Sequence, residues 1–159
     1  MKYLLYIAFL FPIGAASTVA AEPSHIIAMT QKSAETFYIQ GTIQGVGNIE
    51  FLVDTGSSYV TINEHTLATL KQQGKVNYVK DLMGILANGQ RERISVYRIE
   101  TIKLSEKCEL HDIEAAVFPG HARHILGLSA LRKVGAFTFS FDPPQLILAE
   151  CPSSYSSKG

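Results

Sequence analysis

Alternation of apolar and polar residues dominates the chain and predicts a fold made mostly of β-strands. Residues 37–53 alternate on both sides of a glycine-rich turn, which predicts an antiparallel hairpin. Phe137, Phe139 and Phe141 alternate strictly, so one face of that segment is aromatic. The other strand-like segments are 59–62, 76–118 and 146–148. Short alternating strands separated by turns favour an all-β, mainly antiparallel, single domain.

Turn and cap residues divide these strands and predict one or two short helices. Asn63 is a suitable N-cap for a helix that presents Leu67 and Leu70 on one face. Residues 129–134 are expected to form a second short helix, which ends at Gly135. Asn88-Gly89 is the strongest hairpin signal, because a type I′ turn needs positive φ at both central positions.

The N-terminus has the pattern of a secretion signal. Lys2 precedes an apolar run over residues 3–16, and Val19-Ala20-Ala21 supplies the small residues that a signal peptidase reads. We therefore expect residues 1–21 to be a signal peptide, export to the periplasm or secretion, and no stable membrane span after cleavage. An uncleaved anchor is the alternative. The remaining divisions are an irregular lead-in over 22–35, one domain over 36–150 and a disordered tail over 151–159.

Composition and charge exclude several classes of protein. Of the 159 residues, 47% are hydrophobic, which is too many for a chain that is mostly disordered. Fourteen basic residues balance fourteen acidic ones, so no basic excess neutralises the phosphates of a nucleic acid. Two cysteines are too few for a four-cysteine zinc site. In an oxidising compartment Cys108 and Cys151 either pair or remain two separate buried thiols, and the sequence leaves both possibilities open.

The candidate chemistry lies at Asp54. Its carboxylate directly follows the apolar run Phe51-Leu52-Val53, where an unsatisfied charge would be costly. Thr55 carries a hydroxyl that braces the loop, and Gly56 lets the backbone turn and bring amides close to the carboxylate. Ser57 is expected to donate its hydroxyl to the outer carboxylate oxygen. The segment therefore predicts a carboxylate held in fixed geometry at the end of a strand.

Two motifs in this order resemble the aspartic proteases. Asp54-Thr55-Gly56-Ser57 matches their active-site motif, and Ile125-Leu126-Gly127 before a short helix matches the partner loop of the same fold. The succession of Asp-Thr-Gly, hairpin, Ile-Leu-Gly, helix and final strand resembles the single-domain retropepsins, and most closely the bacterial exported retropepsin-like proteases. The resemblance extends over residues 37–148.

This resemblance implies an aspartic endopeptidase that acts on a peptide or protein and needs neither a metal nor another cofactor. Its chemistry requires two carboxylates that share one proton. The chain has one Asp-Thr-Gly, so a complete site needs Asp54 from each chain of a homodimer. By resemblance, Thr55 of each chain cross-braces the dyad, and strands at 137–141 and 146–148 build the dimer sheet. The other aspartates without the required loop are Asp81, Asp112 and Asp142.

Two further expectations concern the substrate and the pH. The hairpin tipped at Asn88 and Gly89 falls where the family carries a flap that closes over the substrate, although a plain surface hairpin is the alternative. A hydroxyl donated by Ser57 would favour the ionised form of the catalytic carboxylate, so activity is expected to be best in acid.

Other sequence features support weaker interpretations. His121 and His124 lack a Cys or acid at a supporting spacing, so solvated loop histidines are favoured over a zinc site. A second function stays open, namely a retropepsin-like domain that binds a peptide or a partner without cleaving it.

Overall fold

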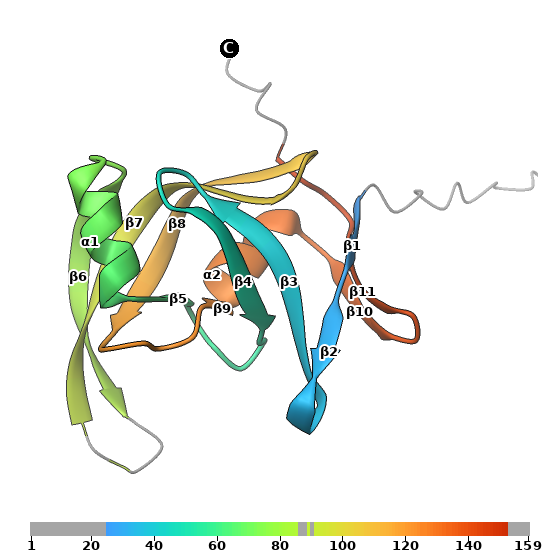
Figure 1. Ribbon diagram of the computed structural model, residues 1–159, viewed down its shortest axis with the longest axis horizontal. Coiled ribbons are helices and arrows are strands. Elements are labelled where there is room, and N and C mark those ends of the chain that lie inside the picture. Colours follow the sequence, from blue (N-terminus) through green and yellow to red (C-terminus); the bar gives the residue numbers. More distant parts are fainter. Residues whose placement is uncertain (1–24, 86–88, 90, 153–159) are drawn as a thin grey trace, which may run out of the picture.

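A computed structural model of the chain, shown in Figure 1, describes residues 25–85, 89 and 91–152. The predicted signal peptide, Asn88 and the tail beyond residue 152 lie outside these residues. Among the described residues, strands far outnumber helices, which confirms the predicted all-β single-domain fold. The strands are β1 (His25–Ala28), β2 (Thr30–Lys32), β3 (Thr36–Ile43), β4 (Gly47–Val53), β5 (Val60–Asn63), β6 (Val76–Ile85), β7 (Arg91–Ser105), β8 (Cys108–Phe118), β9 (Ile125–Leu126), β10 (Phe137–Phe141) and β11 (Pro144–Leu148). The helical segments are the α-helices α1 (Glu64–Gln72) and α2 (Leu128–Leu131) and the 3-10 turns η1 (Ser33–Glu35) and η2 (Arg132–Val134).

Eight strands form one sheet in the order β2-β3-β4-β9-β5-β8-β7-β6, and an additional pairing of β3 with β7 closes it on itself. The alternating apolar residues of these strands point inward, because burying them removes apolar surface from water. Most of them form one large cluster that includes Ile39, Phe51, Ile99, Ile102, Leu110 and Ile113, all essentially inaccessible to solvent, and Ile94, Val96 and Ala116 form a second, smaller one. The closed sheet is therefore the rigid body on which the loops are carried.

The local turn and cap predictions are confirmed. β3 and β4 pair antiparallel, and the turn between them uses positive φ values of 88° at Gly45 and 107° at Gly47. Asn63 caps α1 by accepting a hydrogen bond from the Thr66 amide at 2.9 Å. The helix is followed by Gly74 in the left-handed region, with φ of 64°.

The long hairpin of β6 and β7 extends beyond the closed sheet. The two strands pair from Val76 opposite Ile99 to Ile85 opposite Arg91. Gly89, in the connection, has the positive φ of 81° that the hairpin prediction requires at this position. In the view of Figure 1 this end of the hairpin and the loop after β4 lie on the same, lower side of the molecule.

A second sheet of three strands, in the order β1-β11-β10, joins the two ends of the described chain. The predicted irregular lead-in over residues 22–35 is wrong from His25 onward, because β1, β2 and η1 occupy it. β1 is stabilised by antiparallel pairing with β11, from His25 opposite Leu148 to Ala28 opposite Gln145. This partner lies at the other end of the chain, so no local pattern signals the strand.

A disulfide fastens this second sheet to the first. Cys108, the first residue of β8, is bonded to Cys151, which follows β11, and their Cα atoms are 5.2 Å apart. The bond spans 43 positions of sequence. Of the two possibilities that the sequence leaves open, the structure has the paired cysteines. Among the described residues, no helix is long and apolar enough to cross a bilayer.

Candidate active site

Asp54 lies at the point where β4 ends, and its backbone and side chain are both held. Its amide donates to the Leu126 carbonyl at 3.2 Å, and its carboxylate Oδ1 accepts a hydrogen bond from the Gly56 amide at 2.8 Å. A Cβ added at Gly56 would lie only 3.1 Å from that oxygen, so glycine permits this approach. The carboxylate is half-buried, which leaves one part of it accessible and the rest fixed by the loop.

Thr55 and Ser57, on either side of Gly56, are placed differently. Thr55 is exposed, and its hydroxyl forms no hydrogen bond with the described part of the chain. The Ser57 hydroxyl donates to the Tyr59 carbonyl at 2.9 Å. A hydroxyl has one hydrogen to donate, so the predicted bond from Ser57 to the Asp54 carboxylate is not formed. The expected acid optimum therefore has no support from Ser57.

The Ile125-Leu126-Gly127 motif packs directly against the Asp54 loop and the end of β4. β9 runs parallel to β4, with Ile125 opposite Leu52 and Leu126 opposite Val53. The Leu128 amide then donates to the Ser57 carbonyl at 2.8 Å. Two segments far apart in sequence thus form one hydrogen-bonded unit around Asp54.

Gly127 is the point of closest contact between these two loops. A Cβ at this position would meet the Tyr59 carbonyl oxygen and would lie 2.7 Å from the Ser57 carbonyl oxygen. No rotamer can relieve a clash between a Cβ and backbone atoms. A side chain at position 127 would therefore force the Asp54 loop away from β9.

Ser129 braces the site in a way that the sequence does not reveal. Its hydroxyl accepts a hydrogen bond from the Val60 amide at 2.8 Å and donates one to the Glu114 carbonyl at 2.7 Å. It therefore bridges β5 and β8 behind the Asp54 loop. Only the tertiary structure brings these three segments together.

His124 is a half-buried polar group beside the second motif. Its Nε2 lies 2.8 Å from the Thr66 hydroxyl on α1, and its ring meets the Phe51 ring edge-on at 6.1 Å between centroids. Burial lowers the pKa of His124, because it disfavours the charged imidazolium. His121 is exposed, and no group of three or more potential metal ligands occurs among the described residues.

Two cavities flank the Asp54 loop. The first has a volume of about 580 Å³, and Asp54 and Thr55 line it together with three aromatic side chains. The second has a volume of about 330 Å³ and contacts the loop through Ser57. A larger and more polar hollow of about 650 Å³ includes neither Asp54 nor Thr55, so size alone does not locate the site. The aromatic residues of the first cavity are Phe37, Phe139 and Phe141.

These three rings form a cluster that reaches the surface. Phe37 meets Phe139 edge-on at 5.1 Å and Phe141 at 5.5 Å between centroids. Phe141 is 69% exposed. Phe141 thus adds exposed aromatic surface at the cavity that Asp54 lines.

Comparison with protein families assigns the fold and its loops to a known group. The model of a family described as "gag-polyprotein putative aspartyl protease" matches residues 39–133, which is more than half of the chain and includes both motifs. The chain belongs to this family of gag-polyprotein aspartyl proteases. No curated protein sequence is significantly similar to it.

Solved structures support the same assignment. The chain is similar to a retropepsin-like aspartic protease from Rickettsia conorii, with a TM-score of 0.57 and 25% sequence identity, over 78% of this chain and 88% of that one. The retroviral protease-like domain of Ddi1 from Leishmania major shares the fold, with a TM-score of 0.53 and 17% identity over 71% of this chain and 87% of that one. This member of the gag-polyprotein aspartyl protease family thus has the retropepsin-like fold in its single-domain form.

Proposed function

We propose that the protein is an aspartic endopeptidase whose active site forms across a homodimer, with Asp54 contributed by each chain. The observation that carries this proposal is the state of Asp54. Its carboxylate is fixed by the Gly56 amide, remains partly accessible and lines a cavity. This is the arrangement expected of half of a carboxylate pair.

In the proposed reaction the two carboxylates share one proton, because two like charges at close range cannot both ionise. The ionised carboxylate takes a proton from a water molecule while the water oxygen attacks the scissile carbonyl. The protonated carboxyl transfers its proton to the carbonyl oxygen and forms a gem-diol. As the diol collapses, the carboxyl that took the proton from water gives it to the amide nitrogen, the other carboxylate takes a proton from a diol hydroxyl, and the C–N bond breaks, releasing an acid and an amine and restoring the shared proton.

A site within one chain would need a second carboxylate, and Glu35 is the other acidic residue that lines the same cavity within the described part of the chain. Glu35 lies in η1 and has no Asp-Thr-Gly-type loop to hold its side chain. The two-chain site is therefore favoured, and the experiment below separates it from a site built on Asp54 and Glu35.

The dimer contact is proposed along the edge of β10. Of the two segments expected to build the dimer sheet, residues 146–148 lie in β11, which is paired on one side with β1 and on the other with β10 and so has no open edge. In the described residues, β10 pairs only with β11, so its other edge is open to a partner strand. Phe139 and Phe141 of β10 line the Asp54 cavity, which would bring the second chain next to the catalytic residue.

Two finer proposals accompany this function. The β6–β7 hairpin serves as a flap over the substrate, supported by its position on the same side as the Asp54 loop in Figure 1. The chain is exported, as in the bacterial exported branch that its sequence resembles. The secretion-type N-terminus and the Cys108–Cys151 disulfide support this, because disulfides persist in oxidising compartments.

Cleavage of a peptide library at acid pH, with the wild-type chain and Asp54→Asn, tests the catalytic role. The variant keeps the side-chain volume but removes the shared proton, so it is expected to lose cleavage entirely. Equal cleavage by both would show that Asp54 is not catalytic. Peptide binding by both without cleavage by either would favour the non-catalytic binding domain.

Mixing the two chains tests whether the site is shared. In an equal mixture that pairs at random, the activity per wild-type chain is expected to fall to about half, and in a ninefold excess of variant to about a tenth. A site contained in one chain would retain its full activity at every ratio, which would reject the homodimeric site.

A further inference from the structure

We propose that Arg123 makes the cavity beside Ser57 selective for an acidic side chain of the peptide substrate. This inference rests on the proposed function, because it assigns a substrate preference to the same site. It concerns binding, however, and is tested below independently of cleavage.

The cavity lies against both loops that hold Asp54. It has a volume of about 330 Å³ and is walled by Ser57, Thr61, Phe118, Ala122, Arg123 and Ile125. Ser57 belongs to the Asp54 loop, and Ile125 is paired with Leu52, two residues before Asp54. A peptide whose scissile bond reached Asp54 would therefore place one of its nearby side chains here.

Arg123 brings an unneutralised positive charge to this cavity. Its side chain is exposed, and no carboxylate of the described residues lies within ion-pair distance of it. By contrast, Arg93 and Arg98 each lie within 4.0 Å of a carboxylate oxygen. The guanidinium therefore keeps donors free for a ligand.

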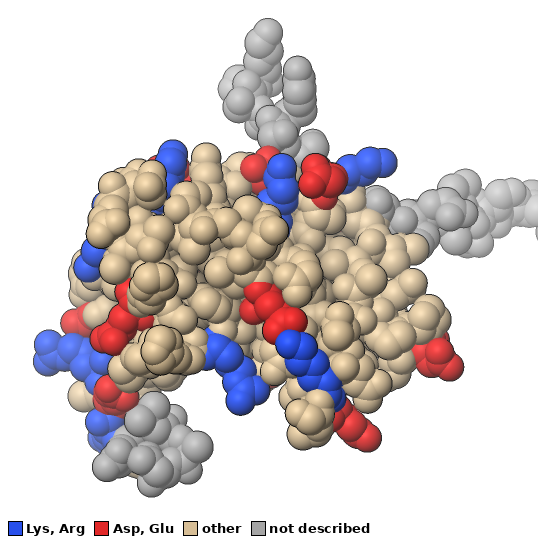
Figure 2. All heavy atoms as spheres, viewed as in Figure 1, with Lys and Arg blue, Asp and Glu red and all other residues tan. Residues whose placement is uncertain are grey.

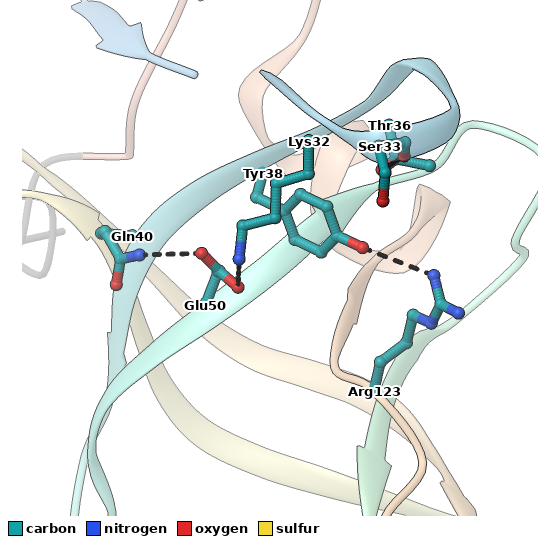
Figure 3. Close-up of polar contacts among 7 residues, drawn as sticks. All are labelled: Lys32, Ser33, Thr36, Tyr38, Gln40, Glu50 and Arg123. Atoms are coloured by element: carbon teal, nitrogen blue, oxygen red, sulfur yellow. Dashed lines mark hydrogen bonds and ion pairs between the residues drawn. The ribbon is translucent and has the colours of Figure 1, made fainter. Parts of the chain in front are cut away.

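The contacts of Arg123 within the fold orient it without neutralising it. Figure 3 shows its side chain directed toward Tyr38, whose hydroxyl accepts a hydrogen bond from Arg123 Nη1 at 3.4 Å. The carboxylate of Glu50, on the other side of Tyr38 in this view, is engaged by Lys32 at 2.6 Å and by Gln40 at 3.3 Å. Glu50 is therefore already partnered and does not cancel the charge of Arg123.

The cavity walls suit the rest of an acidic side chain. Phe118, Ala122 and Ile125 offer apolar surface to the methylene groups of a glutamate, while its carboxylate faces the guanidinium. Arginine binds carboxylates through two parallel hydrogen bonds, which adds specificity to the charge attraction. Acidic and basic side chains are interspersed over the face shown in Figure 2, so the preference arises locally rather than from a general positive field.

Binding to the Asp54→Asn chain measures this preference without cleavage. Fluorescent peptides that carry glutamate at one position in turn are compared with their glutamine counterparts by anisotropy, at a pH above ~4.3, where a glutamate side chain is ionised. At one position we expect glutamate to bind about tenfold more tightly than glutamine. The difference is expected to shrink at high ionic strength, because the guanidinium is exposed.

Three variants in the same Asp54→Asn background complete the test. Arg123→Gln is expected to bind both peptides equally, and Arg123→Glu to prefer lysine at the same position. Lys107→Gln is the control variant and is expected to keep the glutamate preference. It removes the same charge from the turn before β8, at the opposite end of this 11-residue strand from Phe118, which lines the cavity. No preference at any position, or a preference that survives Arg123→Gln, would overturn the inference.

Failure of the inference and failure of the proposed function give different results. Asp54-dependent cleavage of peptides without any glutamate preference would reject the role of Arg123 and leave the protease intact. A glutamate preference lost in Arg123→Gln, in a chain that cleaves no peptide, would support the acidic pocket and reject the protease.

Discussion

The two sheets of the molecule are built by the same alternation of residues but differ in what they leave open. The eight-stranded sheet closes on itself through the β3–β7 pairing and buries the core around Phe51 and Ile99. The three-stranded sheet does not close, and Phe141 and Ile26 on its outer strands are 69% and 56% exposed. The closed sheet thus holds the Asp54 loop, whereas the open sheet has the free edge along which we propose that another chain binds.

This difference separates the part of the molecule that holds Asp54 in place from the part that would bring a second carboxylate to the proposed site. The Asp54 loop is held by hydrogen bonds to Leu126 of β9 and to Leu128 and Ser129 at the start of α2. The second carboxylate would arrive along the β10 edge of the open sheet. Substitutions in the two regions should therefore act on different quantities, namely the stability of one chain and the association of two.

The largest expected effect, on the free energy of unfolding, comes from removing the disulfide that joins the two sheets. Replacing both cysteines, Cys108→Ser with Cys151→Ser, is expected to lower the free energy of unfolding by about 4 kcal/mol, because the unfolded chain regains the freedom of a loop closed over 43 positions. Urea denaturation measures it. Reductant should destabilise the wild type to the level of the variant and leave the variant unchanged; a wild type insensitive to reductant would contradict the role of the bond.

The next effect concerns the open sheet alone. Phe141→Asp is expected to weaken dimer formation about 100-fold, because it places a charge within the proposed contact. Sedimentation measures association, and specific activity should recover as the concentration is raised. Tyr78→Asp is the matched control, since Tyr78 is an aromatic residue that is 57% exposed on β6, away from this edge. Equal association of both variants would place the dimer contact elsewhere.

The smallest expected effect is a pH dependence of the stability of the folded chain, which arises from His124 next to β9 of the closed sheet. The pKa of His124 is lowered by burial in the folded state, so the unfolded chain binds more protons as the pH falls below ~6.5. The stability from neutral His124 is therefore complete above that pH and declines below it. Thermal unfolding of the wild type should show this decline, and His124→Gln should flatten it. Parallel curves for the two chains would show that His124 does not contribute.

Features that depend on neighbouring residues could be predicted without a structure. The β3–β4 hairpin, the cap at Asn63 and the end of α1 before Gly74 follow from turn and cap chemistry within a few residues. The loop around Asp54 belongs to the same class, because the group that holds its carboxylate is the amide of Gly56, two positions away.

Features that depend on partners far away in the sequence could not be predicted without a structure. β1 in the predicted lead-in exists because β11, at the other end of the described chain, pairs with it. The place of Arg123 at a cavity next to the Asp54 loop also appears only once β9 lies beside β4.

By itself, the sequence determined the class of fold, the family and the residue that carries the proposed chemistry, because each is written in short-range patterns of polarity, turn residues and motif order. The tertiary structure alone decided which cysteine state occurs, which strand edge stays open and which charged side chain lines the cavity next to the Asp54 loop. The physical reason is that pairing between distant segments depends on how the whole chain buries its apolar surface, and no single segment contains that information.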